Sequence, residues 1–132
     1  MHIPVIVTFY AGLNGLIALA LAVLVVRQRN KTKTSLGSGG HPALEQAIRA
    51  HGNFIEYVPL ILLLLLLLEL CGTRAIVLYG LGAALTIGRI LHAWGLHTAA
   101  GESIGRFAGI TLAWATLLVA AVLAIVHGIA AL

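Results

Sequence analysis

The sequence predicts an all-α integral membrane protein that forms an antiparallel bundle of four transmembrane helices. Three observations support this prediction. Of the 132 residues, 61% are hydrophobic and only 9% are charged, whereas a water-soluble domain carries about 25% charged residues. A helical span needs about 20 mostly apolar residues, so a chain of this length with short connections has room for four. No segment shows the alternating pattern of a half-buried strand.

We expect a single membrane domain over residues 1–132, with its spans divided by charged and glycine-rich segments. The spans are expected at about residues 3–26, 52–71, 75–97 and 106–130. The first span contains no charged residue and ends at the basic run that begins with Arg27, which favours a mature helix over a cleaved signal peptide. Pro42 follows a loop at residues 32–40 and opens the second helix, while residues 98–105 form the third loop.

The basic residues predict how the bundle is oriented. Those on the side of the first and third loops are Arg27, Arg29, Lys31, Lys33, Arg49 and Arg106. The opposite side carries only Arg74. Because short cytoplasmic loops are enriched in Lys and Arg, we expect the first and third loops in the cytoplasm and both termini outside.

Several function classes are not supported by the sequence. The six histidines form no i, i+4 pair and no cluster with Cys or carboxylates, so no metal site is predicted. Nucleotide-binding motifs and serine-hydrolase motifs are absent from the sequence. The basic residues cluster on one side of the predicted spans, as membrane topology explains, and we expect no nucleic-acid partner.

Polar residues interrupt the second and third spans near the same membrane surface. The uncharged stretch at residues 57–68 is too short to cross the bilayer, so the second span has to include Asn53 and Glu56. Together with Arg49 these residues are spaced i, i+4, i+7, and Arg89 and His92 are spaced i, i+3, so each set lies on one helical face. Glu56 and Arg89 come out at similar depth and are predicted to pair. These two faces carry more hydrogen-bond donors than Glu56 can satisfy, which favours an anionic ligand. The alternative is that the polar groups only bond one helix to the next.

Small residues recur on the third helix at a spacing that favours close helix packing. Gly80, Ala84 and Gly88 form a small-xxx-small ridge, with Gly82 nearby. Such ridges let two helical backbones approach each other. We therefore expect this face to lie against a neighbouring helix.

The polar residues of the second helix also carry a family resemblance. The segment from Arg49 to Pro59 has an RxxxNxxEYxP pattern at the start of a long hydrophobic helix, and it resembles the signature of the MAPEG family, the membrane-associated proteins in eicosanoid and glutathione metabolism. The resemblance covers nearly the whole chain, including Arg89, with His92 three residues on, and Arg106 at the last helix. The sequence of residues 50–53 resembles that of the bacterial members, which implies a bacterial inner membrane protein.

This resemblance implies a homotrimer that binds glutathione at subunit interfaces near the cytoplasmic side. The implied activity is that of a glutathione transferase or peroxidase acting on lipophilic electrophiles that arrive from the bilayer. The implied glutathione-binding residues are Arg27 or Arg29 of the first loop, Arg49, His51, Asn53, Glu56, Tyr57, Arg89 and His92. Arg106 is implied as the catalytic residue that stabilises the glutathione thiolate.

Two departures from the family pattern keep an alternative open. Family members often carry a Tyr where this chain has Leu96, and the third loop differs in length from that of better-known members. The alternative is a non-catalytic glutathione-binding or structural membrane protein of the same fold. A small multidrug transporter would also have four spans, but it would need an acidic residue in the first helix, and residues 3–26 contain none.

Overall fold

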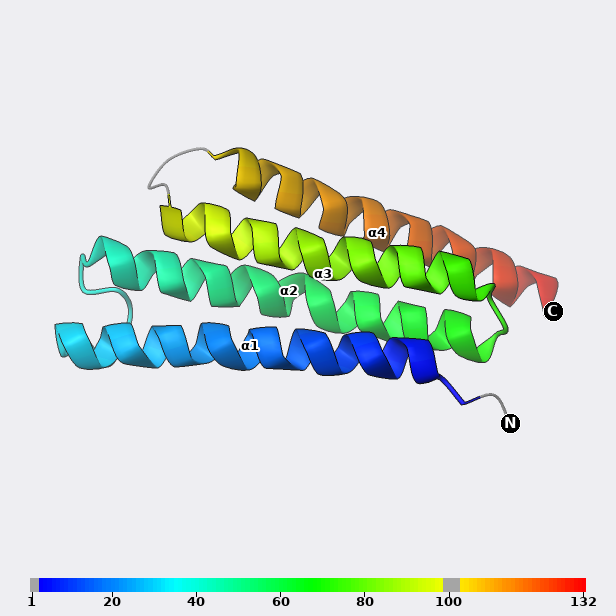
Figure 1. Ribbon diagram of the computed structural model, residues 1–132, viewed down its shortest axis with the longest axis horizontal. Coiled ribbons are helices and arrows are strands. Elements are labelled where there is room, and N and C mark those ends of the chain that lie inside the picture. Colours follow the sequence, from blue (N-terminus) through cyan, green and yellow to red (C-terminus); the bar gives the residue numbers. More distant parts are fainter. Residues whose placement is uncertain (1–2, 99–102) are drawn as a thin grey trace.

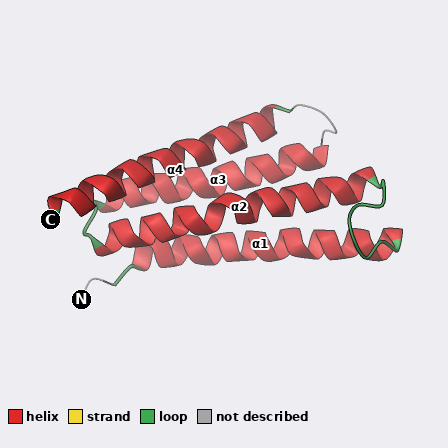
Figure 2. Cartoon of the chain, turned by 180° about the vertical axis from the view of Figure 1, so that it is seen from behind, coloured by secondary structure: helices red, strands yellow, loops and turns green. Residues whose placement is uncertain are grey.

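The computed structural model describes residues 3–98 and 103–132, which fold into four antiparallel helices and no strand (Figures 1 and 2). The helices are α1 (Val5–Thr32), α2 (Pro42–Leu70), α3 (Ala75–Thr98) and α4 (Ile104–Ala130). Each is long and apolar enough to cross a membrane. The predicted fold class is therefore confirmed, while the predicted third loop falls largely on residues 99–102, outside the described residues.

The two ends of the bundle differ in chemistry. The basic end carries the α1–α2 connection together with Arg27, Lys31, Arg49 and Arg106, and the terminal end carries both chain termini and the α2–α3 turn (Figure 1). At the basic end α1 and α2 extend beyond α3 and α4, as both views show (Figures 1 and 2). The first turns of α2 therefore continue past the start of α4.

The start of α1 is capped from α2. The first backbone N–H groups of any helix lack partners within that helix. Here the carboxylate of Glu69, near the end of α2, accepts hydrogen bonds from the backbone N–H of Ile6 at 2.9 Å and of Val7 at 2.7 Å. Glu69 is only 2% exposed, so its charge is satisfied by the N-terminus of α1, where the helix dipole favours an anion.

Local sequence signals account for the bounds of α2 and α4. α2 begins at Pro42, in the first turn where the missing N–H costs nothing, and ends before Gly72, whose φ of 78° favours glycine. Ser103 caps α4 by accepting a hydrogen bond from the backbone N–H of Arg106 at 3.2 Å. The helix starts at Ile104, so Arg106 lies within its first turn and not at its first residue.

The core lies around α2 and α3. Both α1 and α4 pack against these two helices. Fully buried apolar residues include Ile61, Leu65, Leu85, Ala113 and Ala120. Large apolar residues such as Leu16, Leu63 and Leu118 are exposed on the outer faces. An outer surface of this kind suits a lipid environment, and the chain is accordingly a membrane protein.

Candidate functional site

A polar cavity of about 260 Å³ lies at the basic end between α2, α3 and α4. Its lining consists of Glu45, Gln46, Arg49, Asn53, His92, Leu96 and Arg106. Arg49, Asn53, His92 and Arg106, which the sequence predicts to lie on three different helices, are thus brought together here. We refer to this space as the polar cavity.

Helical spacing explains how α2 contributes to the polar cavity. Glu45, Arg49 and Asn53 are spaced i, i+4, i+8 and therefore lie on one face of α2. On α3, His92 and Leu96 are likewise one turn apart. Positions at these intervals stack along a helix, so α2 and α3 each present one face to the same space, and α4 adds Arg106.

Arg89 lies fully buried beside the polar cavity and links three helices. Its side chain is 1% exposed. Nη1 donates to Oδ1 of Asn53 on α2 at 2.8 Å, and Nη2 donates to the backbone oxygen of Gly109 on α4 at 2.8 Å. Arg89 is therefore a residue that positions Asn53 and α4, and it does not line the polar cavity.

The predicted ion pair between Glu56 and Arg89 is wrong within this chain. The guanidinium of Arg89 is directed at Asn53 and Gly109, whereas Glu56 is exposed on α2. The prediction used depth in the membrane alone. Depth does not specify the direction in which a side chain leaves its helix, and here the two directions differ.

Glycines allow α4 to lie directly against α3 beside the site. A Cβ atom on Gly109 would lie 2.5 Å from the backbone oxygen of Gly88 and 2.6 Å from the backbone nitrogen of His92. A Cβ on Gly95 would lie 2.5 Å from the backbone nitrogen of Arg106. Real Cβ contacts are longer than this, so only glycine permits the approach that places Arg106 next to His92.

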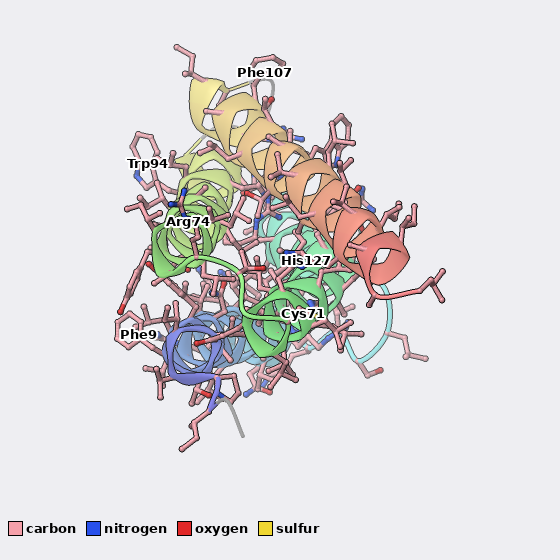
Figure 3. The ribbon with its side chains drawn as sticks, turned by 90° about the vertical axis from the view of Figure 1, so that its right-hand side faces the viewer. Phe9, Cys71, Arg74, Trp94, Phe107 and His127 are labelled. Atoms are coloured by element: carbon pink, nitrogen blue, oxygen red, sulfur yellow. The ribbon has the colours of Figure 1, made fainter. Side chains whose placement is uncertain are left out.

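A second, more apolar cavity of about 680 Å³ adjoins the polar cavity. It is lined by His92, Ser103, Ile104, Arg106, Phe107 and Ile110, and we call it the α4 cavity. His92 and Arg106 line both spaces. Phe107 points away from the bundle near the start of α4 (Figure 3), and it is 73% exposed. The α4 cavity thus joins a hydrophobic outer surface to His92 and Arg106, the two side chains that line both spaces.

The basic residues of the first loop region have different roles. Arg29 donates from Nη1 to the backbone oxygens of Thr34, Ser35 and Gly37, at 3.3, 3.0 and 3.1 Å. It therefore holds the α1–α2 connection in shape. Arg27 is exposed at the basic end, and neither residue lines the polar cavity.

The remaining predicted residues of α2 lie beside the polar cavity and not in its wall. Glu56 is exposed, and His51 and Tyr57 are half-buried. None of the three is among the residues that line the polar cavity within this chain. Glu56 lies on a face of α2 that this chain leaves exposed, whereas the ring of Tyr57 packs against the hydrophobic core.

Sequence reasoning missed several residues of the site. Glu45 lies one turn before Arg49 on the same face of α2, so extending the i, i+4 pattern backwards would have found it. Gln46 lies beside it, and Ser103 carries an N-cap signal. Within the described residues no group of three or more His, Cys, Asp or Glu side chains is placed to hold a metal ion.

The fold and the site define a helical membrane protein with four apolar spans and a polar cavity between three of them at its basic end. The MAPEG family model matches residues 7–126, and the chain belongs to this family. It is similar to the inner membrane protein YecN of Escherichia coli (strain K12), with 34% identity over 109 residues, covering 83% of this chain and 82% of the relative. The protein of the same name from Escherichia coli O6:H1 matches with the same identity and coverage. These relatives agree with a membrane location.

Proposed function

We propose that this protein is a glutathione-dependent membrane enzyme, of the transferase or peroxidase type, that acts on lipophilic electrophiles. The observation that carries the proposal is the convergence of Arg49, His92 and Arg106 with Glu45 in one partly enclosed space. Membership of the MAPEG family supports the same reading.

The charges of the polar cavity are complementary to those of glutathione. The tripeptide carries two carboxylates and one ammonium group. Guanidinium groups bind carboxylates through paired, charge-assisted hydrogen bonds, which suits Arg49. Glu45 supplies a carboxylate for the ammonium group. The oxygen of Asn53 is occupied by Arg89, so its amide nitrogen is the group that is suited to donate to the ligand.

Arg106 is suited to act on the thiol. A thiol has a pKa near 8.5, and a neighbouring guanidinium favours the thiolate, which is the reactive nucleophile. Because Arg106 lines both the polar cavity and the α4 cavity, a thiolate beside it would face an electrophile that enters from the apolar side. In conjugation the sulfur forms a bond to the electrophilic carbon, and the leaving group departs with its bonding electrons.

We propose a homotrimer in which each glutathione site is completed by a neighbouring subunit. The polar cavity holds about 260 Å³, which is below the range of about 300–1,000 Å³ typical of small-molecule sites. Arg27 and Glu56, which the resemblance assigns to glutathione, are exposed outside the polar cavity. A second chain packed on these faces would enlarge the site and cover both residues.

We further propose that the basic end faces the cytoplasm across a bacterial inner membrane. The clustering of Lys and Arg at this end supports this orientation. The name of the Escherichia coli relative, an inner membrane protein, supports the choice of membrane. Glutathione would then be drawn from the cytoplasm and the electrophile from the bilayer.

The proposal is tested by titrating glutathione into the purified protein and following heat release by calorimetry. The thiolate absorbance band is recorded in the same samples at neutral pH. We expect binding that is lost in Arg49→Ala and retained in Arg74→Ala, which removes an exposed arginine at the terminal end. Arg106→Ala should abolish the thiolate band. An absence of binding to the wild-type protein would overturn the proposal.

One observation favours the non-catalytic alternative. Leu96, which is 6% exposed and lines the polar cavity, stands where family members often carry a Tyr, so this site lacks that phenol. Glutathione binding without a thiolate band, and without consumption of lipophilic electrophiles or peroxides, would support a binding protein. Thiolate formation with turnover would exclude that alternative.

A further inference from the structure

A third cavity, of about 450 Å³, lies at the basic end on the side of the bundle that carries α1. We call it the apolar cavity. Its walls come from three helices, with Leu21 and Leu24 on α1, Ala50 on α2 and Trp94 on α3. Neither the family resemblance nor the proposed glutathione site accounts for it.

The apolar cavity exists because short side chains face α1. The alanines in its lining are Ala43, Ala47, Ala50 and Ala93. Larger side chains at these positions would fill the space between α1 and the α2–α3 pair. The alanines instead leave a volume within the range of sites for small ligands. Leu24 and Trp94 in its lining are 40% and 61% exposed, so the space is open on one side and a ligand can enter it from the surroundings.

The polarity of the apolar cavity changes along its length. Leu21 and Leu24 belong to the uncharged part of α1, whereas Gln28 lies just beyond Arg27, where the basic segment begins. Gln46 on α2 lines the same space. The described lining includes no charged side chain. One end of the cavity is thus hydrocarbon-like and lies in the span, and the other end carries two neutral amides at the membrane surface.

We propose that the apolar cavity binds a single-chain amphiphile with an uncharged polar head. The alkyl chain lies along Leu21, Leu24 and Trp94, and the head group bonds to the amides of Gln28 and Gln46. An amide side chain can both donate and accept, which matches a hydroxyl or an ester. A charged head would lose its hydration without gaining a counter-ion from this lining, which selects against it. The proposal does not depend on glutathione binding.

The test uses the fluorescence of Trp94 in lipid nanodiscs, without glutathione. Trp114, an exposed residue of α4, is replaced in a Trp114→Phe background so that Trp94 is the reporter. The probe is ω-bromododecanol, whose bromine quenches a neighbouring indole. We expect quenching that saturates and is relieved by excess dodecanol. Bromododecanoate, with its charged head, should give a markedly weaker saturable component.

Variants distinguish quenching by a probe bound in the apolar cavity from quenching by a probe in the surrounding lipid. Ala47→Leu and Ala93→Leu each fill the apolar cavity and should remove the saturable component. Ala115→Leu adds the same volume to an exposed position on α4 and should leave it unchanged. Quenching that rises linearly with probe, is not relieved by dodecanol and is equal in all variants would overturn the proposal. Because dodecanol competition is measured in the otherwise wild-type cavity, this result does not depend on how the variants fold.

Discussion

Arg89 of α3 donates a 2.8 Å hydrogen bond to Oδ1 of Asn53 on α2 while its other terminal nitrogen bonds the backbone of Gly109 on α4. One buried guanidinium therefore fixes the positions of three helices at the level of the polar cavity. It also engages the amide oxygen of Asn53, a residue that lines the polar cavity. The arrangement joins the stability of the bundle to the shape of the site.

Replacing Arg89 by Met should destabilise the protein. The change removes the donor from the partly buried oxygen of Asn53 and from the buried carbonyl of Gly109, which costs about 2 kcal/mol of unfolding free energy. Thermal unfolding in detergent measures the effect. Arg74→Met, at an exposed position of the terminal end, is the control and should match the wild type. Equal melting temperatures for all three proteins would contradict the assigned role.

Replacing Glu69 by Ala should loosen the start of α1. Two hydrogen bonds from the carboxylate to the N–H groups of Ile6 and Val7 are lost, with a cost of about 2 kcal/mol. Hydrogen exchange gives a local measurement, because the amides of Ile6 and Val7 should exchange faster. Glu45→Ala, which removes an exposed carboxylate, should leave those two amides unchanged. Unaltered exchange in the Glu69 variant would show that another group caps α1.

A methyl group at Gly109 should separate α4 from α3. The new Cβ would meet backbone atoms of Gly88 and His92, which cannot move aside as a flexible side chain can. Overpacking of this kind costs about 2 kcal/mol, and the shift of α4 should weaken the proposed binding of glutathione because it displaces Arg106. Gly128→Ala is the matched control, since a Cβ there meets nothing within 4 Å. Wild-type stability and affinity in Gly109→Ala would rule out close packing at this point.

Two cysteines test the orientation of the bundle. Cys71 is exposed at the terminal end and should react with an impermeant thiol reagent added outside intact cells. A Ser38→Cys, Cys71→Ser variant places its thiol in the α1–α2 connection at the basic end and should react only after the membrane is opened. The reverse labelling pattern would mean that the basic end faces outward.

The elements of the fold follow closely from sequence because hydropathy and helix-boundary signals act locally. Pro42 opens α2 as predicted, and the helix ends at Leu70, within one residue of the predicted end of the second span at residue 71. The small-residue ridge on α3 was right only in part. Gly88 packs tightly against α4, but a Cβ at Gly80 would meet nothing within 4 Å, and Gly82, beside the ring of Tyr10, makes the close contact with α1. Spacing identifies a face of small residues without identifying which helix covers each of them.

The site was predictable to the extent that one helical face determines it. Arg49 and Asn53 share a face of α2, and the structure adds His92 and Arg106 from other helices to the same cavity. The partner of Arg89 was not predictable from depth, because Asn53 and Glu56 are at similar depths but leave α2 in different directions. The role of Arg29 depends on the path of a loop through residues 34–37. Such contacts arise only when the chain has folded.

The contact between Glu69 and the start of α1 also bears on how the protein is made. The segment at residues 5–32 is synthesised before Glu69, and the carboxylate that satisfies its first amides comes more than sixty residues later. Until then those N–H groups have to remain with water or lipid head groups, so α1 alone is an incomplete unit of insertion. The shortest nascent chain that contains both these N–H groups and the carboxylate that binds them is the hairpin of α1 and α2. In ribosome-bound chains that stop before residue 69, α1 should therefore be less stable than in chains that extend past this residue.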